Sequence, residues 1–169
     1  MKIAFLIIDM QKLFLDDSVD KRQIESACEY INYVSNILRK TGHPVVHIQD
    51  MEGRQHDLNP EVRNIIPQIA VEPDDLRVEK EYSNAFWQTN LEQLLRDRGV
   101  KFVVTAGFSA EYCVTFTTNG AAERGFPVAI LQKGFLSQDP DAVRSVYRDR
   151  QVVSYSAIEF MAKACQGLS

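Results

Sequence analysis

The chain has 169 residues, of which 45% are apolar and 25% are charged, and its formal net charge is −4. This length supports one domain with a substantial core. The charge pattern excludes the basic face that a nucleic-acid-binding protein needs, and no apolar segment reaches the roughly 18 residues of a membrane span. The sequence therefore predicts a single domain over residues 1–169, with neither nucleic acid nor membrane as a partner.

The three cysteines, Cys28, Cys113 and Cys165, further limit the class of protein that this sequence can encode. An odd and sparse set of cysteines is not a disulfide framework, and no Cys/His cluster has the spacing of a zinc site. The apolar run at the N-terminus stops at Asp9 without a small-residue cleavage site, so it predicts a buried strand rather than a signal peptide. These features predict free thiols in a reducing cytoplasm.

Short apolar runs alternate with segments of helical periodicity along the chain. In chain order, we predict strand Ile3–Ile8, helix Arg22–Lys40, strand Pro44–Gln49, strand Leu76–Glu79, helix Asn84–Arg98, strand Lys101–Ala106, helix Glu111–Arg124, strand Pro127–Leu131, helix Pro140–Asp149, strand Gln151–Val153 and helix Ser156–Cys165. This alternation indicates an α/β, Rossmann-like, three-layer sandwich: a mostly parallel six-stranded sheet with helices on both faces.

The segment 50–73 is the least regular part of the chain. It is polar and has little periodicity, so we expect a long loop with one helical turn around 61–66. Long loops in compact domains are often functional. The acidic pairs Asp16-Asp17 and Asp74-Asp75 are expected to lie in solvated loops.

Three reactive side chains fall where predicted strands end: Asp9, Lys80 and Cys113. The carboxyl ends of parallel strands share one edge, and ligands bind in the crevice outside it. These three side chains suit catalysis by a thiol nucleophile, with a cation that stabilises the thiolate and an acid/base group that exchanges its proton. The alternatives are a buried inert cysteine, a capping aspartate and a surface lysine.

The remaining polar candidates give weaker signals. His43 and His47 lie four apart on a predicted strand, so we expect both on one face, in packing roles. Asp50, Glu52 and His56 could ligate a cation, but three mixed ligands in a polar loop are a weak metal signal. The aromatic residues near Asp9 and Lys80 could wall a flat apolar pocket; they are Phe14, Tyr82, Phe86 and Trp87.

Three motifs together resemble a known family. Asp9–Phe14 resembles the opening D-x-Q-x-x-F motif of the isochorismatase-like cysteine hydrolases, which include nicotinamidases. Lys80–Leu91 resembles the K-x-x-x-N-[AS]-F-x-x-T-x-L stretch of that family, and Gly107–Val114 resembles its G-x-x-x-x-x-C-V nucleophile segment. The order of the motifs matches over nearly the whole chain.

The resemblance implies a catalytic triad of Asp9, Lys80 and Cys113. It also implies a cis peptide bond between Phe108 and Ser109, with the amides of Ser109 and Cys113 as an oxyanion hole. A homo-oligomer, either a dimer or a tetramer, is a further implication.

The second strand is followed by a departure from the nicotinamidase pattern. Nicotinamidases carry a metal-binding D-x-H there, whereas this chain has Asp50-Met51-Glu52. We therefore expect no metal or other cofactor. By its place in the first motif, Gln11 is expected in the substrate pocket.

The sequence thus predicts a cysteine hydrolase that cleaves a C–N amide bond of a small molecule through a thioester. One alternative is isochorismatase-type vinyl-ether hydrolysis, in which Asp9 protonates the substrate and Cys113 is a bystander. The other alternative is a catalytically silent binding protein on the same fold.

Overall fold

The structure is a computed structural model that describes residues 1–15 and 19–166. The expectation for Asp16 and Asp17 lies outside these residues. The strands are β1 Lys2–Ile8, β2 Val45–Asp50, β3 Leu76–Lys80, β4 Val100–Phe108, β5 Val128–Leu136 and β6 Val152–Val153. The helices are α1 Lys21–Lys40, α2 Leu91–Asp97, α3 Thr115–Glu123, α4 Pro140–Asp149 and α5 Tyr155–Gln166, with 3₁₀ turns at Arg54–His56 and Pro60–Arg63 and a π-helical turn at Ala110–Val114.

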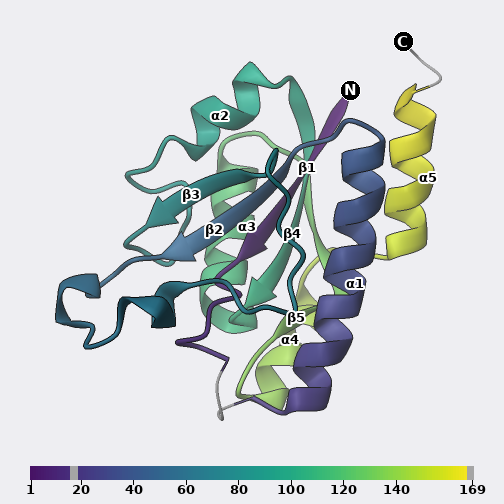
Figure 1. Cartoon of the computed structure of the whole chain (residues 1–169). Coiled ribbons are helices and arrows are strands. Elements are labelled where there is room, and N and C mark those ends of the chain that lie inside the picture. Colours follow the sequence, from purple (N-terminus) through teal and green to yellow (C-terminus); the bar gives the residue numbers. More distant parts are fainter. Residues whose placement is uncertain (16–18, 167–169) are drawn as a thin grey trace.

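The six strands form one parallel sheet in the order β3-β2-β1-β4-β5-β6. Helices α1 and α5 pack against one face of the sheet, and α2, α3 and α4 against the other (Figure 1). The predicted three-layer α/β sandwich is confirmed. None of the helices in the described ranges is long and apolar enough to cross a membrane.

Strand β1 lies in the middle of the sheet and is buried on both faces. Ile3, Phe5 and Ile7 pack under α1 and α5, whereas Ala4, Leu6 and Ile8 pack into the core of the opposite face. Helices covering both faces explain why this strand is a continuous apolar run rather than an alternating one. The run brings Asp9 to the carboxyl edge of the sheet.

The predicted helix Asn84–Arg98 is wrong in its first half, because α2 begins only at Leu91. Gln88 has a φ of 54°, which lies outside the right-handed helical region and interrupts a helix over these residues. Asn84 Oδ1 accepts from Phe86 N at 2.9 Å, and Thr117 Oγ1 of α3 accepts from Ala85 N at 3.0 Å. These side-chain bonds hold the segment before α2 as a turn.

Other parts of the chain also differ from the prediction. Strand β5 continues to Leu136 instead of ending at Leu131, and its pairing with β4 resumes after a register shift between Thr105 and Gly107. The segment 50–73 holds two 3₁₀ turns in place of one helical turn around 61–66.

The predictions for the histidines and for Asp75 also need correction. His43 precedes β2 and does not share a strand face with His47; its Nδ1 accepts from Ile3 N at 3.2 Å. The Asp75 carboxylate is buried rather than solvated. It pairs with Arg39 at 2.6 Å and with His47 Nε2 at 2.9 Å, and these partners offset its desolvation.

Candidate active site

Four adjacent strands deliver side chains to one point on the carboxyl edge of the sheet. Asp9 directly follows β1, Asp50 ends β2, Lys80 ends β3, and Cys113 lies in the π-helical turn after β4. Because these strands are neighbours, in the order β3-β2-β1-β4, the four residues converge. Asp50 and Lys80 are paired across the β2–β3 ladder.

The ammonium group of Lys80 lies at the centre of the cluster. Its Nζ is 2.9 Å from Asp9 Oδ2, 2.8 Å from Asp50 Oδ2 and 3.5 Å from Cys113 Sγ. The two carboxylates and the sulfur lie within 4.8 Å of one another. Asp9 and Lys80 are almost fully buried, whereas Cys113 is partly exposed, so the sulfur is the member that a ligand can reach.

The backbone around Asp9 is tightly confined. Asp9 has a φ of 50°, which is uncommon for a residue other than glycine. Gly107 on the neighbouring strand has a φ of 118°, and a Cβ there would lie 2.0 Å from Ile8 O. The close approach of β1 and β4 at this point requires glycine and brings Asp9 near the segment that carries the thiol.

The segment that carries Cys113 begins with a cis peptide bond between Phe108 and Ser109, at the place where the family resemblance implies one. The turn that follows is closed by hydrogen bonds from Tyr112 N and Val114 N to Ser109 O, at 3.2 and 3.1 Å. Glu111 accepts a hydrogen bond from Ser137 Oγ at 3.0 Å. The segment is therefore tied to the end of β5, and Cys113 is positioned by local structure.

Burial and neighbouring charges shift the pKa values of the cluster. Burial raises the pKa of Asp9 to about 6, although Lys80 lowers it in part. Burial and the charge of Asp9 raise the pKa of the Cys113 thiol to about 12, against the opposing effect of Lys80. Burial lowers the pKa of Lys80, but Asp9, Cys113 and Asp50 outweigh it and raise the pKa overall. The cluster therefore favours a thiol, an ammonium and a carboxylate that titrates near neutrality.

Asp50 belongs to the cluster in a way that the sequence analysis did not anticipate. Sequence reasoning treated it as a weak metal ligand, whereas its carboxylate contacts Lys80. Arg63, from the long loop, also reaches it, with a 3.7 Å ion pair to Oδ1. The strand-end position of Asp50 resembles that of Asp9 and was an available signal; nothing in the sequence pointed to Arg63.

The four pocket candidates lie in different environments. The ring of Phe14 stacks on Phe108 with centroids 5.9 Å apart, next to the cis bond. Tyr82 and Trp87 are half exposed and, with Lys80, line a hollow of about 220 Å³. Phe86 is buried against Phe126 in the core and is not among the residues that line this hollow.

Gln11 is fully buried, and its amide group bonds to the backbone. Its Nε2 donates to Asp50 O at 3.1 Å and to Arg63 O at 2.7 Å, and its Oε1 accepts from Asp50 N at 2.7 Å. With these bonds, Gln11 braces the strand end rather than presenting its amide to a ligand.

The metal candidates do not come together. Glu52 and His56 are exposed on the loop, and the only metal-ligand cluster found among residues 1–15 and 19–166 is Asp9, Asp50 and Cys113. The Lys80 ammonium contacts all three of those residues, and its charge would repel a metal cation placed among them. The donor set therefore does not fit a metal ion while Lys80 is charged.

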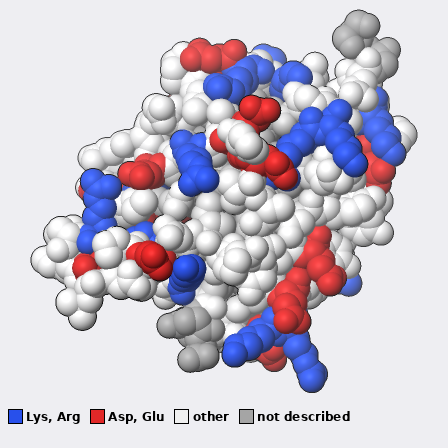
Figure 2. Space-filling view, in the orientation of Figure 1, with Lys and Arg blue, Asp and Glu red and all other residues white. Residues whose placement is uncertain are grey.

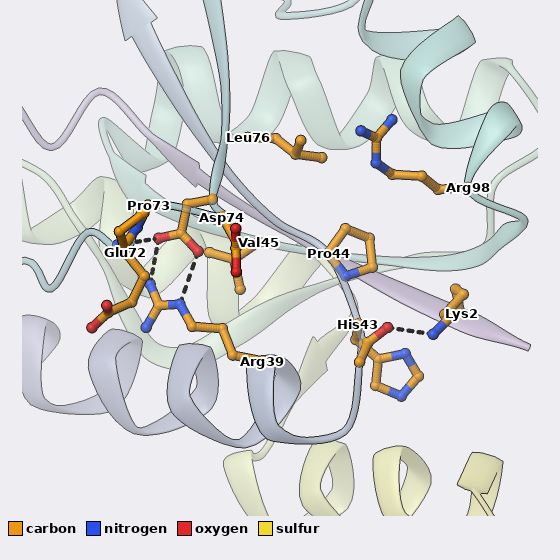
Figure 3. A pocket seen from close by; sticks show the side chains of 12 residues that line it. Lys2, Arg39, His43, Pro44, Val45, Glu72, Pro73, Asp74, Leu76 and Arg98 are labelled. Carbon is orange, nitrogen blue, oxygen red and sulfur yellow. Dashed lines mark hydrogen bonds and ion pairs between the residues drawn. The ribbon is translucent and has the colours of Figure 1, made fainter.

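A larger hollow of about 560 Å³ lies at the amino ends of the strands, away from the cluster (Figure 3). Its basic side chains already have partners: Arg39 pairs with Asp75, Lys2 donates to Gly42 O, and Arg98 donates to Leu94 O. On the face in Figure 2, acidic and basic side chains are interspersed. Size alone does not identify the functional site in this molecule.

The comparisons with known proteins agree with this architecture. The chain matches the Isochorismatase domain over residues 3–155. The uncharacterized isochorismatase family protein YrdC of Bacillus subtilis is 29% identical over 133 residues, which cover 77% of this chain and 71% of that protein.

Two solved structures share the fold. An isochorismatase family protein from Burkholderia thailandensis has a TM-score of 0.86 at 20% identity, with 96% of each chain covered. An N-carbamoylsarcosine amidase from Thermoplasma acidophilum has a TM-score of 0.77 at 23% identity, with 92% of this chain and 97% of that chain covered. Together with the match over residues 3–155, these findings confirm the resemblance: the chain belongs to the isochorismatase family.

Proposed function

We propose that this protein is a cysteine hydrolase that cleaves the C–N bond of a small amide through a thioester on Cys113. The observation that carries the proposal is the contact of the Lys80 ammonium with both Asp9 and the Cys113 sulfur. This arrangement places a nucleophile, a proton acceptor and a fixed positive charge within reach of one carbonyl group.

The first half of the reaction forms the thioester. Asp9 takes the proton of the Cys113 thiol as the sulfur attacks the carbonyl carbon, and Lys80 stabilises the developing negative charge. The backbone N–H groups of Ser109 and Cys113 donate to the oxyanion. Collapse of the tetrahedral intermediate breaks the C–N bond, and the departing amine takes the proton from Asp9.

The second half releases the acid. Asp9 removes a proton from a water molecule that attacks the thioester carbon, and the C–S bond breaks as the carboxylic acid forms. The proton returns from Asp9 to the sulfur, which restores the thiol. No metal ion is needed, because Lys80 supplies the positive charge at the reacting centre.

The raised pKa of the thiol supports a role for Asp9 as general base. At neutral pH a thiol whose pKa is about 12 is protonated, so it must lose its proton as it attacks. Asp9 interacts with the thiol and can accept that proton. An amidase from Thermoplasma acidophilum on the same fold is consistent with C–N bond cleavage.

The raised pKa of Asp9 favours a second candidate reaction, vinyl-ether hydrolysis. A carboxyl group with a pKa of about 6 is partly protonated near neutral pH, and vinyl-ether hydrolysis needs such an acid. In that reaction Asp9 protonates the substrate, and Cys113 forms no bond to it. The two reactions therefore differ in their requirement for the sulfur.

The test is ammonia release from a panel of small primary amides, including N-carbamoyl compounds. We expect wild-type turnover of at least one amide, unchanged by EDTA, and a loss of at least about a thousandfold in Cys113→Ala. Cys165→Ser on α5 is the matched control and should retain activity. Full activity of Cys113→Ala on the same amide would refute the thioester route.

A further inference from the structure

The second carboxylate on Lys80 suggests a role beyond the three residues of the proposed reaction. Asp50 Oδ2 lies 2.8 Å from Lys80 Nζ, as close as Asp9 Oδ2 at 2.9 Å. We propose that Asp50 is a positioning residue that holds the Lys80 ammonium against the Cys113 sulfur. This inference rests on the proposed function, because it assigns Asp50 a task in the same reaction.

The donor count of the ammonium group supports this role. A lysine ammonium carries three N–H donors, and Lys80 Nζ has three neighbours in the cluster: Asp9, Asp50 and Cys113. One N–H of the ammonium bonds to Asp50 Oδ2 and another to the Cys113 sulfur at 3.5 Å, whereas Asp9 contributes an ion pair. Without Asp50, the ammonium would be held by Asp9 alone and could rotate away from the sulfur.

Asp50 can act as an anchor because it is itself fixed. The amide group of Gln11 bonds to both its backbone N and its backbone O, at 2.7 and 3.1 Å. Its Oδ1 accepts from Glu52 N at 2.8 Å, and Arg63 donates to its carbonyl at 3.3 Å. Arg63 is in turn held by Asp57 at 2.6 and 3.0 Å. These bonds leave Oδ2 directed to Lys80.

This arrangement also gives the long loop a function. The 3₁₀ turn Pro60–Arg63 supplies the Arg63 side chain, and the Gln11 side chain bridges Arg63 O and Asp50 O. A change in the loop would therefore alter the position of Lys80 through Asp50, although the loop contributes no atom to the proposed reaction.

The test compares Asp50→Asn with Asp75→Asn. Both substitutions remove a buried carboxylate that pairs with cations, but Asp75 lies at the opposite end of the sheet. The first readout is NMR of the lysine ammonium groups, in which Lys80→Met assigns the signal of Lys80. We expect a signal protected from solvent exchange in wild type and in Asp75→Asn, and its loss in Asp50→Asn.

The second readout is the rate of alkylation of Cys113 by iodoacetamide, followed by peptide mass spectrometry, which needs no substrate. We expect Asp50→Asn to slow alkylation at least about tenfold, because the thiolate loses its fixed cation, and Asp75→Asn to leave it within about twofold. On any amide that wild type hydrolyses, kcat should fall by a similar factor in Asp50→Asn, with little change in KM.

Retention of the protected ammonium signal, or an unchanged or faster alkylation rate in Asp50→Asn, would overturn the positioning role. An equal loss in Asp75→Asn would also overturn it, because the effect would then be one of general stability. A failure of wild type to hydrolyse any amide refutes the proposed function, whereas the ammonium signal and the alkylation rate still decide the role of Asp50.

Discussion

At the residue scale, the protonation state of Asp9 should control the rate. In the proposed reaction the carboxylate form of Asp9 is the general base, so activity would require Asp9 to be ionised, and its pKa is raised to about 6. We expect kcat/KM for an amide to rise about tenfold per pH unit below pH 6 and to level off above it. A rate that instead falls as pH rises through 6 would indicate that Asp9 acts as an acid and would favour vinyl-ether hydrolysis.

Lys80 should matter for stability as well as for chemistry. Lys80→Met leaves the buried carboxylates Asp9 and Asp50 without their shared cation, which should cost about 3 to 5 kcal/mol at pH 7. The loss of the cation further raises the pKa of the Asp9 carboxyl in the folded state, because Lys80 lowers it in wild type. Stability then falls as pH rises through that pKa, so the penalty should be smaller at pH 5.

Urea unfolding of wild type and Lys80→Met at pH 5 and pH 7 measures this penalty. Lys163→Met is a suitable control, because Lys163 forms an exposed ion pair with Glu159 whose removal should cost less than about 1 kcal/mol. An equal effect of the two substitutions would contradict the central position of Lys80.

At the element scale, the contact between β1 and β4 should be intolerant of any side chain at Gly107. A Cβ there would lie 2.0 Å from Ile8 O, in a backbone conformation that alanine rarely adopts. Gly107→Ala should lose at least about 3 kcal/mol, whereas Gly99→Ala should lose about 1 kcal/mol, because Gly99 has a positive φ but open space around it.

Thermal unfolding and the soluble yield of the two glycine variants check this prediction. Equal losses in Gly107→Ala and Gly99→Ala would mean that positive φ alone, and not the close approach of the strands, sets the requirement for glycine. The site would then depend less on the β1–β4 contact than its geometry indicates.

The elements also show where sequence reasoning failed. The helix predicted over Asn84–Arg98 fails in its first half, where Gln88 has a φ of 54°. Ala85 N donates to Thr117 Oγ1 on α3, far along the chain, so this bond could not be inferred from local sequence. Phe86 was expected in the pocket because it lies close to Lys80 in sequence, whereas its packing on Phe126 in the core depends on the tertiary structure.

At the scale of the whole molecule, the parallel topology made the proposed site predictable. Apolar runs that end in Asp9, Lys80 and the segment before Cys113 are local signals, and a parallel sheet brings such ends to one edge. The residues of the site that the sequence did not predict are recognised only by their neighbours in three dimensions. Asp50 was interpreted through its polar sequence context, and Arg63 reaches the site from a loop with no periodic pattern.

The most direct measurement is mass spectrometry of the enzyme quenched with acid during turnover of its best amide. We predict an added mass equal to the acyl group, located on the peptide that contains Cys113 and removed by hydroxylamine. The adduct should be absent from Cys113→Ala and present in Cys165→Ser. Steady turnover with no acyl adduct on Cys113, and undiminished in Cys113→Ala, would contradict the account.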